Sequence, residues 1–148
     1  MRIARGRSLV IALWAGSLWT VGYLVAPTLF ATLSDRILAG TIAGAMFRSE
    51  AWLSLVCGLL LLVMLRAGAD LEAKQRRTMM IIASVMIVCT LVSHLGITPF
   101  MTALREAAGP GGVMASGDRT RFGVLHGVSS VIYLIQSVLA AMLIWKHR

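Results

Sequence analysis

The chain has 148 residues, of which 58% are hydrophobic and 14% charged, with a mean hydropathy of +0.84. These values exclude a soluble globular domain, and the length leaves room for one helical membrane domain over residues 1–148. The formal net charge of +8 does not indicate nucleic-acid binding, because the fourteen Lys and Arg residues mostly lie outside the apolar segments and do not form one basic face.

The first apolar segment covers residues 9–33 and follows three arginines near the amino terminus. It is too long for a typical signal peptide and has no convincing cleavage site, so the sequence predicts an uncleaved membrane-spanning helix. Pro27 lies near the far end of this segment. We expect it to kink or end the helix, because proline has no N–H to donate.

The second predicted span covers residues 40–65 and carries Arg48 and Glu50 into the outer part of the membrane. Gly40 and Gly44 give it a face of small residues that permits close contact with another helix. A competing layout places an interfacial helix over residues 37–47, followed by a short span. Sequence alone leaves both layouts open.

The third predicted span covers residues 79–98, after a polar connection over residues 66–77. Thr90, His94 and Thr98 are spaced by four and therefore share one helix face. Pro99 marks an exit from the helix or a kink, and a short amphipathic piece can follow it. The glycine-rich stretch after that piece is typical of a mobile loop.

The fourth predicted span covers residues 122–145. Its polar residues His126, Ser130, Tyr133 and Ser137 recur at helical spacing, so one edge of this helix can carry hydrogen-bonding groups. Three other apolar helices can gather around that edge. The sequence thus predicts an all-α fold, an integral membrane four-helix bundle.

The basic residues favour a cytoplasmic location for both termini, because positive charge gathers on the cytoplasmic side of membrane proteins. With that orientation, nine of the fourteen basic residues lie inside: Arg2, Arg5, Arg7, Arg66, Lys74, Arg76, Arg77, Lys146 and Arg148. We expect a multi-pass protein of a cell membrane, the bacterial inner membrane, in contact with the lipid bilayer.

This topology places unusual residues from all four spans at a similar depth in the outer half of the membrane: Pro27, Arg48, Glu50, His94 and His126. Ionisable groups within spans usually face a bundle interior or a water-filled cavity. We therefore predict a shallow polar pocket, in which Glu50, His94 and His126 are candidate ligands of a metal ion and the two histidines are candidate ligands of haem. Pro99, Arg121, Ser130 and Tyr133 are further pocket or structural candidates.

Each candidate also has a structural interpretation. The histidines can hold helices together by hydrogen bonds, and Arg48 and Glu50 can extend toward the headgroups. Arg121 is typical of an interface anchor. The spans contain no compact metal motif, nucleophile elbow or phosphate-binding loop, so the sequence does not favour an enzyme.

Four stretches resemble the transmembrane protein 205-like family, whose bacterial members carry a domain of unknown function. They are VAPTLFATL from Val25, AGTIAGAMF from Ala39, HLGITPFM from His94 and RFGVLHGVSSVIYL from Arg121. The resemblance implies a four-helix membrane protein and transfers no established reaction. It draws attention to Pro27, Phe30, Gly40, Gly44, Phe47, His94, Pro99, Arg121, His126 and Ser129.

The leading functional hypothesis is a membrane protein that binds or helps to move a small solute or metal ion through an outward-facing polar pocket. Four helices are few for a transporter, so transport implies a homo-oligomer. The alternatives are a haem- or redox-associated membrane protein and an accessory subunit whose polar face packs against a partner in a membrane complex. No nucleic-acid partner is expected.

Overall fold

The computed structural model describes residues 2–68, 70–109 and 111–147. The chain is 90% helical, has no strand among these described residues, and contains four helices long and apolar enough to cross a membrane. This helical content and these four helices confirm the predicted all-α fold with four membrane spans. The helical segments are α1 (Arg2–Trp19), η1 (Thr20–Val25), α2 (Ala26–Thr32), α3 (Arg36–Ala67), α4 (Ala73–Leu91), η2 (Val92–Ile97), α5 (Thr98–Ala107) and α6 (Ser116–His147).

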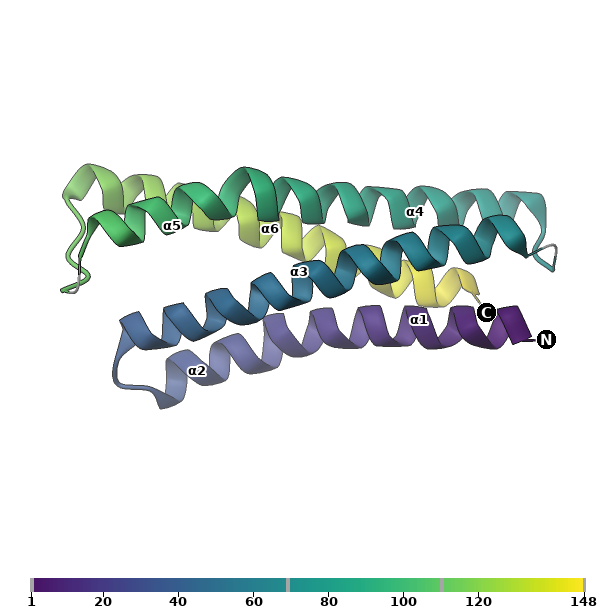
Figure 1. The fold of residues 1–148 in the computed structure, drawn as a ribbon, viewed down its shortest axis with the longest axis horizontal. Helices are drawn as coiled ribbons and strands as arrows, with labels where there is room; N and C mark the ends of the chain where they lie inside the picture. The colour runs from purple at the N-terminus through teal and green to yellow at the C-terminus, as the bar shows by residue number, and fades with distance from the viewer. Residues whose placement is uncertain (1, 69, 110, 148) are drawn as a thin grey trace.

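The four long segments pack as a ring in which α1 contacts α3, α3 contacts α4, α4 contacts α6, and α6 contacts α1. Figure 1 shows both chain termini at one end of the bundle, together with the turn between α3 and α4. We call this end the termini end. The turn between α2 and α3 and the loop between α5 and α6 lie at the opposite end.

The second span begins earlier than predicted and is one continuous helix. Asp35 caps it, because its carboxylate accepts hydrogen bonds from the backbone N–H groups of Ile37 (2.8 Å) and Leu38 (3.0 Å). The cap satisfies two of the donors that a helix start leaves unpaired. A separate interfacial helix over residues 37–47 is therefore wrong, and α3 runs from Arg36 to Ala67.

Pro27 and Pro99 follow the two π-helical segments and do not end their helices. Each proline lies two residues after the segment ends, and helix continues beyond it in α2 and in α5. The N–H of Ala26 bonds the carbonyl of Val21, and the N–H of Thr98 bonds that of Ser93, both five residues back. This wider turn accommodates the missing donor and the bulk of the proline ring, so the chain remains helical.

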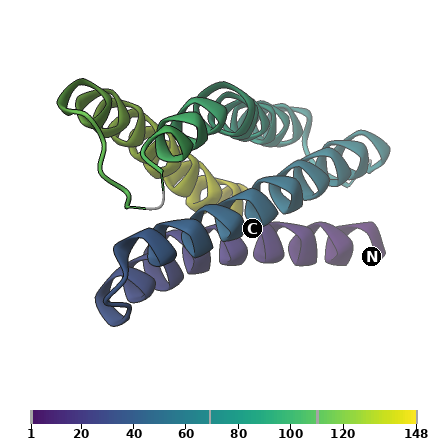
Figure 2. The ribbon, with the colours of Figure 1, turned by 60° about the vertical axis from the view of Figure 1, so that its left-hand side comes forward.

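The apolar core lies in the half of the bundle nearer the termini. α2 and α5 contain no buried residue among those described, and the buried residues of α6 all belong to its second half. In Figure 2 the ribbons of α2 and the start of α3 are separate from those of α5 and the start of α6, and the side chain of Arg105 in α5 joins the two parts by donating to the carbonyl of Gly40. The core residues are Ile11, Trp14, Ala15, Leu18, Cys57, Leu61, Leu65, Met79, Ile82, Ala83, Met86, Ala140 and Leu143.

Polar contacts hold the termini end together. Arg7 is 1% exposed and donates two hydrogen bonds to Asp70, one of 2.9 Å from Nη1 to Oδ1. The hydroxyl of Ser8 lies 2.7 Å from Nε2 of His147, which links α1 to α6. Gln75 donates to the carbonyl of Lys146 and links α4 to α6 (2.6 Å). These contacts fix the ends of helices whose apolar faces pack deeper in the bundle.

The ion pair at the termini end predicts a pH dependence. The hydrogen bonds from Arg7 lower the pKa of Asp70 from an ordinary 3.8 to about 2. The stabilisation is therefore fully present above about pH 3.8 and is lost as the pH falls through about 2. We expect the unfolding temperature in detergent to fall over this interval in the wild type and less in Asp70→Asn, with Asp118→Asn as the matched control. An equal fall in wild type and Asp70→Asn would contradict the assignment.

Candidate functional site

Glu50 lies on the face of α3 that packs into the bundle. Counting from Arg36, it is the fifteenth of 32 residues, close to the middle of the span. Its side chain is 7% exposed, and its Oε1 accepts a hydrogen bond of 2.6 Å from the hydroxyl of Ser54, one turn further along. Ser54 in turn accepts a 2.8 Å bond from the indole N–H of Trp14 in α1. A three-residue hydrogen-bonded chain thus joins α1 to a carboxyl group inside the bundle.

Three aromatic rings from η1, α3 and α6 contact one another. The ring of Tyr133 in α6 meets Phe47 edge-on at 5.3 Å and Tyr23 edge-on at 6.2 Å between ring centroids. Phe47 precedes Glu50 by three positions and therefore lies on the same side of α3. Gly22 admits the ring of Tyr133, because a Cβ atom built at Gly22 would lie 2.2 Å from Cε1 of that ring. The three rings form what we call the aromatic cluster: Tyr23, Phe47 and Tyr133.

The tyrosine hydroxyls tie η1 and α1 to α6. Tyr23 donates to the hydroxyl of Ser137 (2.7 Å), and Tyr133 donates to the carbonyl of Leu18 (2.5 Å). Ser137 donates in turn to the carbonyl of Tyr133 (2.9 Å). The tyrosine hydroxyls are thus paired within the protein.

A second buried polar contact joins α6 to α4. The side-chain amide of Gln136 donates to the hydroxyl of Thr90 (2.8 Å) and to the carbonyl of Met86 (3.2 Å). Both side chains are buried, at 4% exposure each. The contact lies at the edge of the apolar core that is farther from the termini, next to Met86 of that core. Glu50 lies at the same edge, at the end of the chain that begins at the core residue Trp14.

The two predicted histidine ligands contact residues other than Trp14, Ser54 and Glu50. His94 is half-buried in η2, where its ring meets Trp52 edge-on at 5.8 Å. His126 is exposed, and its ring stacks on Phe122 of the same helix. The described residues include no group of three or more His, Cys, Asp or Glu side chains that could hold a metal ion. Glu50, His94 and His126 do not form such a group here, and their role as metal or haem ligands stays a prediction.

The remaining predicted residues lie mostly on the surface. Pro27, Arg48, Pro99, Arg121 and Ser130 are exposed, whereas Tyr133 is half-buried in the aromatic cluster. The hydroxyl of Ser130 bonds the carbonyl of His126 in its own helix (2.8 Å). The predicted polar edge of α6 thus faces the bundle at Tyr133 and Ser137 and is exposed at His126 and Ser130, because only the second half of α6 contributes buried residues.

Arg105 links three helices at the end opposite the termini. Its Nη1 donates to the carbonyl of Gly40 in α3 (3.1 Å), and its guanidinium lies over the ring of Phe122 in α6, 5.0 Å from the centroid. Gly40 and Gly44 lack side chains and leave room for this arginine, which lies within 4 Å of a Cβ built at either glycine. The small-residue face predicted for helix contact is therefore covered by a side chain from α5.

Sequence reasoning identified Glu50 and Tyr133 and missed their partners Trp14, Ser54 and Tyr23. It placed Thr90 on a polar helix face but missed its partner Gln136. Ser54 could have been found, because it follows Glu50 by four residues and so shares its helix face. Trp14 gave no such signal. Its direction depends on how α1 is rotated against α3, which hydropathy does not determine.

Comparison with known proteins identifies one family. The family described as a domain of unknown function (DUF4149) matches residues 9–110, which include α2, α3, α4 and α5. No curated protein and no solved structure matches the chain. The resemblance to a bacterial domain of unknown function is confirmed, and nothing links the chain to transmembrane protein 205. Because the match covers well over half of the chain, this membrane protein belongs to the DUF4149 family.

Proposed function

We propose that this multi-pass membrane protein binds a small organic cation at Glu50 and helps to move it across the membrane in exchange for a proton. One observation carries the proposal: the Glu50 carboxyl group is 7% exposed in the middle of a membrane span and accepts a hydrogen bond from Ser54. Among the residues that the structure describes, no cationic side chain lies within ion-pair distance of it.

The surroundings of the Glu50 carboxyl group determine whether it can be charged. An ionised carboxylate inside hydrocarbon is costly unless a positive partner or several donors compensate it. Arg48 is not the positive partner of Glu50, because it is two positions away on the helix and exposed. One hydroxyl donor does not replace the hydration of a full charge. The group must therefore carry a proton or face a bound cation, and these two states compete.

The aromatic cluster favours an organic cation as the competitor. Cations are attracted to the faces of aromatic rings, and this attraction is strongest where water is excluded. Tyr23 is 52% exposed and Tyr133 is half-buried, so the cluster reaches from the interior of the bundle to its surface. A carboxylate one helical turn from Phe47, whose ring contacts Tyr133, suits an ammonium group that carries small apolar substituents.

The cation enters from the side opposite the termini, where α2 and α5 contribute no buried residue among those described. With both termini in the cytoplasm, as the distribution of basic residues favours, that side is the outside of the cell. A cation entering there would displace the proton from Glu50. Movement across the membrane would also require the packed half to open, so we propose that a homo-oligomer provides the second half of the pathway.

The direct test is proton release. Purified protein in nanodiscs, in a weakly buffered solution with a pH indicator, is titrated with tetramethylammonium chloride, and sodium chloride serves as the ionic-strength control. We expect saturable release of about one proton per site, and apparent affinity that weakens by about tenfold per pH unit where the site is protonated. Saturable binding without proton release at any pH would overturn the exchange. Absence of saturable binding would overturn the proposed function.

A further inference from the structure

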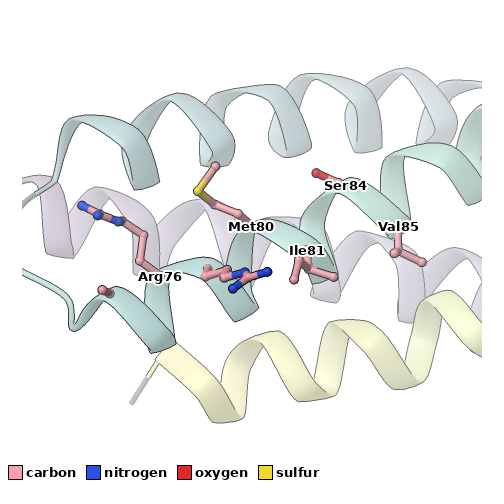
Figure 3. A pocket seen from close by; sticks show the side chains of 7 residues that line it. Arg76, Met80, Ile81, Ser84 and Val85 are labelled. Carbon is pink, nitrogen blue, oxygen red and sulfur yellow. The ribbon is translucent and has the colours of Figure 1, made fainter.

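A surface groove on α4 lies at the level where a membrane begins. It has a volume of about 510 Å³ and its lining comes from one helix: Ala73, Arg76, Arg77, Met80, Ile81, Ser84 and Val85. These positions repeat at intervals of three and four residues and so follow one face. Figure 3 shows the labelled side chains along that face, from Arg76 at one end to Val85 at the other.

The opposite face of α4 forms part of the core. Met79, Ile82, Ala83 and Met86 are buried against the other helices. Ile81 and Val85 are instead 55% and 41% exposed, so the grooved face is directed out of the bundle. In a membrane protein, this direction is the lipid.

The charged lining of the groove consists of Arg76 and Arg77. Over residues 2–68, 70–109 and 111–147, neither Arg76 nor Arg77 has an ion-pair partner. Arg7 at the same end, in contrast, is paired with Asp70. Two guanidinium groups at one end of an apolar groove suit an anion to which an apolar body is attached.

The position of the arginines along the helix fits a phosphate group. The span Ala73–Ala107 contains 35 residues, about 52 Å of helix, which exceeds a hydrocarbon core of about 30 Å by roughly 11 Å at each end. The hydrocarbon then begins about seven residues into the span, near Met80. Arg76 and Arg77 lie in the headgroup layer above this boundary, and Ile81 and Val85 lie below it.

We infer that this groove binds one anionic phospholipid, with its phosphodiester between Arg76 and Arg77 and an acyl chain along Met80, Ile81 and Val85. Arginine suits this role, because its planar guanidinium donates two parallel hydrogen bonds to a phosphate. Basic pockets beside membrane helices recognise lipid headgroups by the same charge complementarity. The site is distant in sequence from Glu50 and does not depend on the proposed function.

Native mass spectrometry tests the inference on the full chain in detergent. We expect retention of phosphatidylglycerol over phosphatidylcholine, and loss of roughly 30-fold in that preference in the double variant Arg76→Gln, Arg77→Gln. The double variant Arg76→Lys, Arg77→Lys should keep part of the preference, because it keeps both charges and loses the paired hydrogen bonds of guanidinium. Arg119→Gln with Arg121→Gln removes two exposed arginines at the other end of the bundle and should keep all of it.

A second variant tests the groove without changing its charge. Ile81→Trp fills the space for the acyl chain and should weaken phosphatidylglycerol binding, while circular dichroism shows wild-type helicity. Three results would overturn the inference: an unchanged preference in the Gln variant, an equal loss in Arg119→Gln with Arg121→Gln, or equally tight binding of glycerol phosphate, which carries no acyl chain. The last would identify a site for a free anion.

Discussion

Glu50→Gln should weaken tetramethylammonium binding by roughly 100-fold, because it removes the negative charge that attracts the bound cation at a buried position. It should also abolish the proton release that accompanies binding. The fold should survive, since a glutamine carbonyl can accept the hydrogen bond that Ser54 now donates to Oε1. We therefore expect a free energy of unfolding at neutral pH that is equal to or higher than that of the wild type.

Two variants give this experiment its controls. Glu106→Gln makes the same chemical change at an exposed position of α5 and should leave binding unchanged. Glu50→Asp keeps the charge but shortens the side chain, so it should bind with intermediate affinity. Wild-type affinity in Glu50→Gln would contradict the proposed site, whereas an equal loss in Glu106→Gln would indicate a general effect of surface charge.

Trp14→Ala should lower the free energy of unfolding by about 3 kcal/mol, the low end of the range for a buried tryptophan. Trp14 is 1% exposed and belongs to the core between α1, α3 and α4. Its removal leaves a cavity among tightly packed neighbours, which matters in a membrane because helix packing there depends on close contact. Reversible unfolding in mixed micelles measures the change.

Trp14→Phe separates packing from hydrogen bonding. It keeps most of the ring and loses the N–H that bonds Ser54, so we expect a loss of about 1 kcal/mol. Trp145→Ala is the matched control, because Trp145 is 77% exposed and its loss should change stability by less than about 0.5 kcal/mol. Equal losses in Trp14→Ala and Trp145→Ala would contradict the position of the core.

The four spans could be predicted from the sequence because apolar length is a local property. The ends of the helices could not. Asp35 caps α3, which therefore starts four residues before the predicted position. The helix continues through Pro99 into α5 because the wider turn of η2 accommodates the proline. Both effects depend on hydrogen bonds at single residues, to which hydropathy averaged over a window is insensitive.

The candidate site could be predicted in part. Glu50 could be identified from the sequence because an ionisable carboxyl group within a membrane span is costly whatever its neighbours are. Which residues surround Glu50 depends on how each helix is rotated about its axis and on which part of each helix packs into the bundle. α6 leaves the core toward its start, so His126 is exposed although its spacing places it on the same edge as Tyr133.

The account depends on a carboxyl group at Glu50 that is protonated without ligand and ionised when a cation binds. Infrared difference spectroscopy of the protein in nanodiscs, with and without tetramethylammonium, measures this state directly. We predict that cation binding removes the carbonyl stretch of a protonated carboxylic acid and adds a carboxylate band, and that Glu50→Gln shows neither change. A carboxylate band from Glu50 already present in the cation-free protein, unaltered by the cation, would contradict the account.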